Sequence, residues 1–462
     1  MDAPVRGYSL EFIQNMITEQ SGRVAGWFND LELRTVFQPT FSLPHKCAIG
    51  FEANLRSADT LGRPVSPQAL FGPVQNYAEA SMLDMLCTTM HVRNFAKSLP
   101  SRSLLLVNLH PEVLLDHGNS AKFLAVLLDH YRVPANKLMI DVPGSVLEQE
   151  NLDEAIAAYR EVGCLIAIDD FGVDNANLDT IWHTTPTLVK IDRTLIDRAV
   201  TDRRIRQILP KAVSLLHEMG TLVLMEGIES EAEALIALDA DADFGSGFYL
   251  GPMLDSLSEF RDSPELLKGL WRTFLKKQDS AGTSETSARL SLEDEALYSS
   301  NIKKLRNASP SEIGRYREER RPFLSAMQDV AARVRAGKAF DVSCDEFLAL
   351  PGAIRCYALD GEGTQTGSEV TAPHPPVQHG PNFHDMCGPL EANWSRRDFF
   401  RRAVKEPGVV QVTRQYCSLA GYPRCVTFSI VVPAGGKPMV ICGDVDWTSH
   451  AMVRIAPGSK ST

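Results

Sequence analysis

The stretch CLIAIDDFG, residues Cys164 to Gly172, decides the fold because a short apolar run ends there in two adjacent aspartates. Leu165 to Ile168 are almost continuously apolar and too few for a helix, so they predict a strand covered on both faces. Two neighbouring carboxylates repel each other and are costly to dehydrate, so at such a strand end they usually hold cations or take part in chemistry. The alternative is an aspartate turn or helix cap, and the rest of the chain has to decide.

The composition describes an ordinary soluble protein. The chain has 462 residues, 44% hydrophobic and 23% charged, which is enough for more than one domain. Its formal charge of -11 argues against a general surface for nucleic-acid polymers, although a local basic pocket remains compatible with it. The sequence opens without an apolar signal core, and no window reaches the ~18 apolar residues of a membrane span. We therefore expect a cytoplasmic protein with no membrane span.

The nine cysteines follow no metal-binding spacing, because none forms a Cys-x-x-Cys pair. In a reducing cytoplasm we expect such residues to be small side chains of the core. Redox or metal sensing by the six C-terminal cysteines is the alternative hypothesis; these are Cys344, Cys356, Cys387, Cys417, Cys425 and Cys442.

Eight short apolar runs alternate with longer amphipathic segments between about residues 30 and 255, a pattern typical of parallel strands joined by helices. Two of the helical segments end in glycine, DEAIAAYREVG at Gly163 and RIRQILPKAVSLLHEMG at Gly220. Eight such units in about 230 residues predict a TIM-type (β/α)8 barrel. The runs are RTVFQPT, CAIGFEANLR, LLLVNLH, LMIDV, LIAIDDFG, LVKIDR, TLVLMEGIE and DFGSGFYLG.

Polar residues close several of these runs. Parallel barrel strands deliver their C-terminal ends to one rim, where active sites are built, so residues spread over about 180 positions should converge there. A turn or a cap would not require this repetition, which makes that alternative the weaker one. The residues are Glu52, Asn108, Asp141, Asp169, Asp170, Lys190 and Glu226.

The predicted rim has oxygen ligands and no histidine or cysteine, which favours Mg²⁺ or Mn²⁺ over Zn²⁺ or copper. Asp169 and Asp170 are suited to serving two cations at once, and two metals ~3.5 to 4 Å apart activate a water and clamp an in-line phosphoryl displacement. Lys190 is placed to orient the water or to neutralise the developing phosphoryl charge. Phosphodiester hydrolysis is the reaction class that follows.

The composition changes after Leu275. KKQDSAGTSETS reads as a linker, and residues 289–336 as charged helices interrupted near Pro310 and Pro322. A second, α+β domain is expected from about Phe340 to Trp447, with a helix, a Gly-rich hairpin and further strands. The expected divisions are 1–275 for the barrel, 276–338 for the linker and connecting helices, 339–450 for the second domain and 451–462 for a flexible tail.

The motifs FEANLR, VNLH, IDDFG, LVKIDR, MEGIE and GSGFYLGPML resemble, in order and spacing, the EAL domain over roughly residues 8 to 270. This bacterial family binds cyclic di-GMP, and its active members hydrolyse it to linear pGpG. The resemblance implies two metals held by Glu52, Asn108, Asp141, Asp169, Asp170 and Glu226. It implies catalysis by Lys190 with Glu52 and Glu226. It implies ligand contacts at Gln38, Arg56, Asp170, Lys190, Glu229 and Ser246.

Several positions depart from the family pattern. Asn54 replaces the signature leucine, Asp141 shortens a metal-binding glutamate, and Gly144 replaces a glutamate that steadies the loop after the aspartate pair. That loop reads Val-Asp-Asn-Ala-Asn at 173–177, and Ser246 replaces the glutamine that helps to place the water. Lost supporting residues typically change metal affinity or activity by ~10 to 100-fold. Two hypotheses follow: a weak or conditionally active cyclic di-GMP phosphodiesterase, or an inactive cyclic di-GMP receptor.

Two further classes explain less. A barrel metalloenzyme for another phosphodiester would explain the carboxylates without the motif series, and a purely structural interaction protein would not explain why the rim residues remain together.

The C-terminal segment resembles PAS/Cache-like sensory domains. Trp394, Arg397, Phe399 and Phe400 fall where such domains contact small ligands, which implies an unknown small ligand. An amphipathic helix with its aromatic residues inward and its other arginines in water is the simpler interpretation. A sensor joined by helices to a barrel predicts a homodimer in which residues 289–336 transmit a change at the sensor to the barrel rim.

Overall fold

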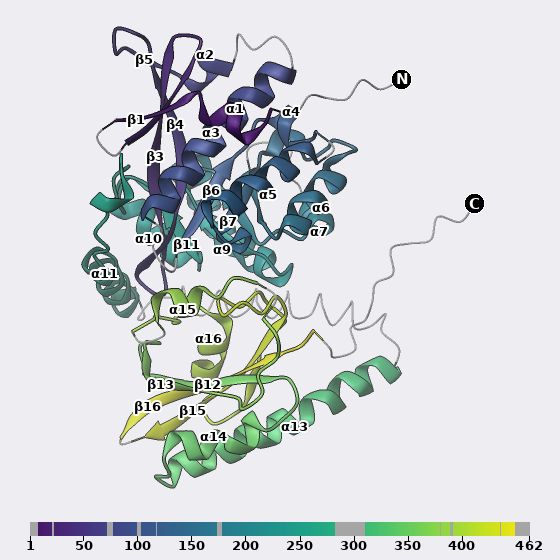
Figure 1. The fold of residues 1–462 in the computed structure, drawn as a ribbon. Coiled ribbons are helices and arrows are strands. Elements are labelled where there is room, and N and C mark those ends of the chain that lie inside the picture. Colours follow the sequence, from purple (N-terminus) through teal and green to yellow (C-terminus); the bar gives the residue numbers. More distant parts are fainter. Residues whose placement is uncertain are drawn as a thin grey trace. The chain divides into compact units, whose positions relative to one another are not determined.

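The computed structural model describes residues 8–20, 23–71, 77–98, 103–116, 118–172, 178–281, 310–378, 380–388, 391–434 and 436–448 (Figure 1). The chain forms two compact units. The first unit comprises Met1–Lys268 and Gly380–Gly388, and the second comprises Gly269–His379 and Pro389–Thr462. The short segment 380–388 is therefore an excursion, in which the chain leaves the second unit and then returns to it.

The first unit is built on a closed eight-stranded barrel (Figure 1). Neighbouring strands follow the order β3-β11-β10-β9-β8-β7-β6-β4, and β4 pairs with β3 to close the ring. All eight apolar runs form barrel strands, so the predicted TIM-type barrel is confirmed. The strands are β3 (Leu31–Ser42), β4 (Cys47–Ala58), β6 (Leu104–Asn108), β7 (Leu138–Val142), β8 (Leu165–Phe171), β9 (Leu188–Ile191), β10 (Leu222–Met225) and β11 (Phe244–Ser246).

One barrel strand runs opposite to the prediction. β3 is antiparallel to both β4 and β11, whereas the other seven strands are parallel to one another. Only a short turn separates Ser42 from Cys47, and parallel strands need a crossover of about a dozen residues or more. The expectation of an all-parallel barrel was therefore wrong for β3, and Gln38 reaches the ring from a strand that runs the other way.

Helices connect the parallel strands, and their ends carry the expected signals. Gly163 caps one helix in the left-handed region with φ of 100°. Ser230 and Glu233 form a reciprocal capping box on another. The helices of this unit are α1 (Leu10–Gln14), α2 (Pro67–Phe71), α3 (Tyr77–Ser98), α4 (Pro111–Leu114), α5 (Asn119–Tyr131), α6 (Leu152–Val162), α7 (Leu178–Thr184), α8 (Arg193–Thr201), α9 (Arg203–Glu218), α10 (Glu231–Asp239) and α15 (Phe383–Cys387).

Three strands outside the barrel were not predicted. β1 (Ile17–Gln20) and β2 (Arg23–Phe28) form a hairpin that extends the sheet beside β3, and β5 (Pro64–Val65) pairs with β4. Apolar side chains of β1 and β2 join those of α1 and α3 in a separate core cluster. None of the helices within the described ranges is long and apolar enough to cross a membrane.

The second unit holds a five-stranded antiparallel sheet in the order β13-β12-β16-β15-β14. The strands are β12 (Ala353–Leu359), β13 (Gln365–Thr371), β14 (Gln411–Val412), β15 (Cys425–Ala434) and β16 (Lys437–Asp446). The helices are α11 (Glu265–Ala281, which begins in the first unit), α13 (Pro310–Arg335), α14 (Phe340–Leu348) and α16 (Asp398–Lys405).

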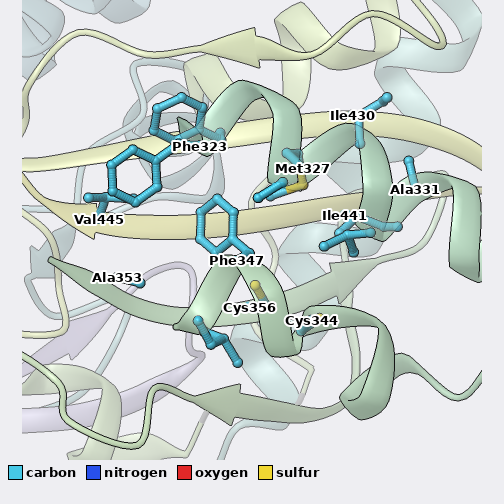
Figure 2. Close-up of a cluster of buried hydrophobic side chains, with 14 of the residues drawn as sticks. Phe323, Met327, Ala331, Cys344, Phe347, Ala353, Cys356, Ile430, Ile441 and Val445 are labelled. Atoms are coloured by element: carbon cyan, nitrogen blue, oxygen red, sulfur yellow. The ribbon is translucent and has the colours of Figure 1, made fainter. Parts of the chain in front are cut away.

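Helices cover both faces of this sheet. On one face α13 and α14 supply Phe323 and Phe347 to an apolar core (Figure 2). Both rings pack with that of Phe428 of β15. Ser429, the next residue along β15, must point to the opposite face, since successive side chains alternate. Its hydroxyl donates to the main-chain oxygen of Phe399 in α16, at 2.8 Å. Helix α16 therefore covers the second face.

Three local predictions in this region need correction. Pro310 does begin α13, but the helix continues through Pro322, where an interruption was expected. The predicted linker starts inside α11, which extends to Ala281, and residues 282–309 lie outside the described residues. The predicted strand VVQVTRQYC is reduced to the two residues of β14.

Candidate functional site

Lys190, on β9, lies at the centre of a group of carboxylates. Its ammonium Nζ is 2.5 Å from Asp141 Oδ2, 2.7 Å from Glu226 Oε1, 3.0 Å from Asp169 Oδ2 and 3.6 Å from Glu52 Oε1. The Lys190 side chain is only 1% exposed. Because β4, which carries Glu52, is not a neighbour of β9, the two side chains meet across the interior of the barrel.

Asn108 completes this group from the end of β6. Its amide Nδ2 donates to Glu52 Oε1 at 2.9 Å, and its register places it opposite Asp141. Asp170 is joined through its main chain, since its N–H donates to Asp169 Oδ1 at 2.7 Å. Its φ of 57° lies in the left-handed region, which is uncommon for a residue other than glycine. The residues predicted at the rim thus come together, with Asp170 linked by its backbone.

The group carries an excess of negative charge, because four carboxylates surround one ammonium. Burial raises the pKa of Asp141 well above its usual value, and Asp169 raises it further while Lys190 opposes the rise. Burial likewise raises the pKa of Glu226. Burial alone would lower the pKa of Lys190, but the carboxylates outweigh it and hold that pKa well above its usual value. Bound cations would relieve this repulsion.

The donor types suit hard divalent cations. Asp141 Oδ1 is buried and has no hydrogen-bond partner, so one carboxylate oxygen remains available inside the group. Carboxylate and amide oxygens are the ligands that Mg²⁺, Mn²⁺ and Ca²⁺ prefer. Within the described part of the chain, no group of three or more His, Cys, Asp or Glu side chains is already arranged as a metal site. The donor types therefore fit cations held by Glu52, Asn108, Asp141, Asp169 and Glu226.

Two of the predicted ligand contacts flank Glu52. The Gln38 amide donates to the main-chain oxygen of Gly251 at 2.8 Å, and Gln38 lies directly opposite Glu52 in the pairing of β3 with β4. Arg56 is exposed on β4, and its guanidinium donates to the main-chain oxygen of Leu55 at 2.9 Å. Glu52 and Arg56 are four positions apart on one strand and so share a face.

Two further predicted ligand contacts, Glu229 and Ser246, follow β10 and end β11. Glu229 forms a two-pronged ion pair with Arg193, with distances of 2.5 and 3.0 Å between guanidinium nitrogens and carboxylate oxygens. Ser246 is 4% exposed and lies opposite Thr40 in the barrel. Sequence reasoning missed Arg193, although it closes the motif LVKIDR that also contains Lys190.

Some departures from the family pattern lie within the described residues, and others lie outside them. Asp141, despite its shorter side chain, still reaches Lys190. Gly144 is buried at the start of a 3-10 turn, Gly144–Val146. The altered loop, residues 173–177, lies outside the described residues.

The predicted sensor residues lie in α16 or just before it, and all of them are buried. Trp394 is 6% exposed, and its indole N–H donates to Gln365 Oε1 at 3.0 Å. The rings of Trp394 and Phe399 are 6.4 Å apart, and Arg397 is also buried. Phe399 and Phe400 of α16 are buried, as the simpler interpretation expects, whereas Arg396, Arg401 and Arg402 are only partly exposed rather than in water.

The cysteines are mostly core residues, as expected. Seven of the nine lie outside any disulfide: Cys87, Cys164, Cys344, Cys356, Cys425 and Cys442 are buried, and Cys417 is partly exposed. The remaining two, Cys47 and Cys387, form a disulfide that was not predicted.

Comparison with known proteins gives a family match and several distant relatives. Residues 24–253 match the EAL domain model. The cyclic di-GMP phosphodiesterase RocR of Pseudomonas aeruginosa is 25% identical over 146 residues, covering 31% of this chain and 37% of RocR. The cyclic di-GMP phosphodiesterase PdeF of Escherichia coli is 25% identical over 206 residues, covering 42% of this chain and 27% of PdeF. The matches thus span 37% of RocR and 27% of PdeF, well short of either relative's full length.

Among solved structures, the Bacillus subtilis YkuI protein, which has an EAL domain and was solved with cyclic di-GMP and calcium, is 19% identical. That match covers 90% of this chain and 94% of YkuI, with a TM-score of 0.48. The family match agrees with the eight-stranded barrel and with the motifs that supply the rim. Residues 24–253 of this chain are therefore an EAL domain.

Proposed function

We propose that the first unit binds cyclic di-GMP at the barrel rim and hydrolyses it weakly or conditionally to linear pGpG. The observation that carries this proposal is the group of four carboxylates and Asn108 around the buried ammonium of Lys190. Two EAL relatives, RocR and PdeF, are named as cyclic di-GMP phosphodiesterases, which supports the same substrate here.

We assign the residues three tasks: holding the metal ions, orienting the attacking water, and contacting the ligand. Glu52, Asn108, Asp141, Asp169 and Glu226, with Asp170, hold two Mg²⁺ or Mn²⁺ ions. When bound, such ions lower the pKa of a water and neutralise charge on the phosphate. Lys190 orients the attacking water and stabilises the charge that develops on the phosphoryl oxygens.

Ligand contacts come from the strands beside Glu52. Arg56, exposed on the same face of β4, binds a phosphate through its guanidinium. Gln38 lies opposite Glu52 and positions the ligand through its amide. Two further positions lie near the ligand in the family. Ser246 replaces the family's glutamine there, and Glu229, which matches the family's glutamate, is paired with Arg193.

A second candidate is a cyclic di-GMP receptor without turnover. The observation that favours it is the loss of supporting residues, since Gly144 and Ser246 replace side chains that steady the loop and place the water. Ligand binding depends on other contacts and can survive when turnover is lost.

The second unit is proposed to be a PAS/Cache-like sensor for a small molecule, with Trp394, Arg397 and Phe399 as candidate contacts. We further propose that the chain forms a homodimer, in which α13 and the residues before it carry a change at the sensor to the barrel rim.

The test separates binding from cleavage. Calorimetry with cyclic di-GMP in Ca²⁺, which often supports binding without turnover, comes first; Mn²⁺ is then added and pGpG is followed by chromatography. We expect binding in Ca²⁺ and slow, Mn²⁺-dependent release of pGpG. Binding without product assigns the receptor function, and absence of binding in either metal overturns both candidates.

The variant Glu52→Ala shows whether the product comes from this site. We expect it to lose activity by about 100-fold or more, since it removes a metal-holding carboxylate. Glu161→Ala, an exposed carboxylate on α6, is the matched control and should be unaffected. Product formation that is unchanged by Glu52→Ala rules out the enzyme proposal.

A further inference from the structure

The disulfide between Cys47 and Cys387 joins two places that are 340 residues apart in the sequence. Their Cα atoms are 5.9 Å apart, within the range that a disulfide can bridge. Cys47 is the first residue of β4, and Cys387 is the last residue of α15. The bond therefore ties the excursion of the chain, Gly380–Gly388, to a strand of the barrel.

A buried aromatic residue anchors the same excursion at a second point. Phe383, the first residue of α15, is 1% exposed, and its ring centre is 4.7 Å from that of Phe244. Phe244 begins β11, and both Phe244 and Cys47 pair with Ser42 of β3. Helix α15 thus covers the β4, β3 and β11 strands at the level of Ser42.

This end of the barrel lies opposite the carboxylate group. Cys47 and Phe244 stand at the amino ends of parallel strands, whereas Asn108 and Glu226 stand at or just beyond the carboxyl ends. Glu52 follows Cys47 on β4 itself. The α15 contact is therefore separate from the rim but shares a strand with it.

The disulfide is accessible to thiol–disulfide exchange, whereas the buried cysteines of the core are not. Cys47 and Cys387 are both partly exposed, whereas six of the seven cysteines outside the disulfide are buried. Thiol–disulfide exchange requires an attacking thiolate to reach one of the two sulfurs, so access decides which bonds react. A bond of this kind persists in oxidising surroundings and is labile in reducing ones.

We propose that Cys47 and Cys387 are a site of reversible thiol–disulfide exchange with low-molecular-weight thiols, and that the bond holds α15 on the barrel. In the forward step a small thiolate attacks one sulfur, the S–S bond breaks, and the released cysteine thiolate takes a proton from water. A second small thiol resolves the mixed disulfide. Two electrons pass to the protein, which gains two thiols, while two small thiols leave as their disulfide.

Reduction leaves α15 with its non-covalent contacts alone. The helix has only five residues, which is too short to be stable without its packing. The Phe383 side chain then becomes the main anchor, and local opening of 380–388 becomes more frequent. In the oxidised protein the covalent link opposes that opening.

The first measurement uses the full chain purified without reductant. Free thiols are alkylated with iodoacetamide before and after treatment with reduced glutathione, and the modified peptides are identified by mass spectrometry. We expect Cys47 and Cys387 to be protected before treatment and alkylated after it. Alkylation of both before treatment, or protection that survives glutathione, overturns the proposed exchange.

The second measurement follows cleavage by chymotrypsin after Phe383. Reduction should raise the cleavage rate by about tenfold or more, because local opening exposes this bond to the protease. Cys387→Ser should be cleaved at the faster rate with or without glutathione, and Cys417→Ser, which changes the other partly exposed cysteine, should behave as the native chain. Equal rates for the oxidised and reduced native chain overturn the claim that the bond holds α15. Neither measurement involves cyclic di-GMP.

Discussion

At the scale of single residues, Asp84 is a buried carboxylate that couples stability to pH. It lies on α3, is 4% exposed, and accepts a hydrogen bond from the main-chain N–H of His110 at 2.8 Å. Burial raises the pKa of Asp84 to about 7; the His110 N–H opposes this rise and the charge of Asp116 adds to it. The ordinary value in an unfolded chain is about 3.9.

This shift has a definite sign. Between about pH 4 and pH 7 the folded chain keeps a proton on Asp84 that the unfolded chain has lost, so the free energy of unfolding falls as the pH rises. The slope from this group is at most about 1.4 kcal/mol per pH unit. Above pH 7 the cost of burying the charged carboxylate is fully present.

We predict that Asp84→Asn removes this dependence, because the amide keeps an acceptor oxygen for His110 and cannot ionise. The variant should be more stable than the native chain at about pH 8, and the difference should shrink as the pH falls towards 5. Thermal unfolding over this pH range measures it. Asp129→Asn, on the exposed face of α5, is the control, and pH profiles of the native chain and Asp84→Asn that run parallel would contradict the prediction.

Much of the candidate site could be predicted at this scale, because each rim residue closes or follows a recognisable apolar run. Glu52, Asn108, Asp169, Lys190 and Glu226 were found in that way. The ion pair of Glu229 with Arg193 was missed, since it joins the loop after β10 to the first residue of α8 and leaves no periodic trace. The Cys47–Cys387 bond was missed for the same reason, because no local pattern links positions so far apart.

At the scale of elements, Gly443 lets α14 lie close to the sheet of the second unit. A Cβ added at Gly443 would be 2.5 Å from the ring of Phe347 and 2.7 Å from the terminal methyl of Met327. Both side chains are fully buried in the core between the helices and the sheet (Figure 2). This closeness leaves no room for a side chain at position 443.

Gly443→Ala should therefore destabilise the second unit by about 1–3 kcal/mol, since the clash forces the ring or the backbone to move. Denaturant unfolding can be followed by the fluorescence of Trp447, which is buried in the same core. Gly269→Ala, in helix α11, is the matched control, because no atom lies within 4 Å of its added Cβ. It should be neutral or stabilising by up to ~1 kcal/mol. Equal denaturant midpoints for Gly443→Ala and the native chain would show that the core accommodates the added methyl group, which would contradict the prediction.

The elements themselves were largely predictable, and their errors have physical causes. Apolar runs identified all eight barrel strands, but a run has the same pattern in either direction, so only the short turn after Ser42 reveals that β3 is antiparallel. Pro322 was expected to break α13. The helix continues because Phe323, Met327 and Val330 on the same helix are buried in the core, and this packing outweighs the cost of a proline in the helix.

At the scale of the whole molecule, contacts far apart in sequence decide the outcome. The chain leaves the second unit for nine residues, Gly380–Gly388, and Phe383 and Cys387 both engage the barrel there. Neither the length of this segment nor its composition distinguishes it from an ordinary loop. The division of the chain into units is therefore less regular than the change in composition after Leu275 indicates.

The proposed homodimer is the prediction that belongs to this scale. We expect the native chain to sediment as a dimer at micromolar concentration, since a sensor unit controls a barrel most simply through contacts between copies.

Helix α9 offers the first face to test, because Ile208 and Leu215 are seven positions apart, lie on one side of the helix, and are 60% and 42% exposed. Ile208→Asp should weaken association by about tenfold or more if this face is covered by a second copy, since a charge would be buried there. Val126→Asp, which charges an equally exposed apolar position on α5, is the control. Sedimentation as a monomer at this concentration, with and without cyclic di-GMP, would refute the dimer; a dimer that tolerates Ile208→Asp would place its interface on another face.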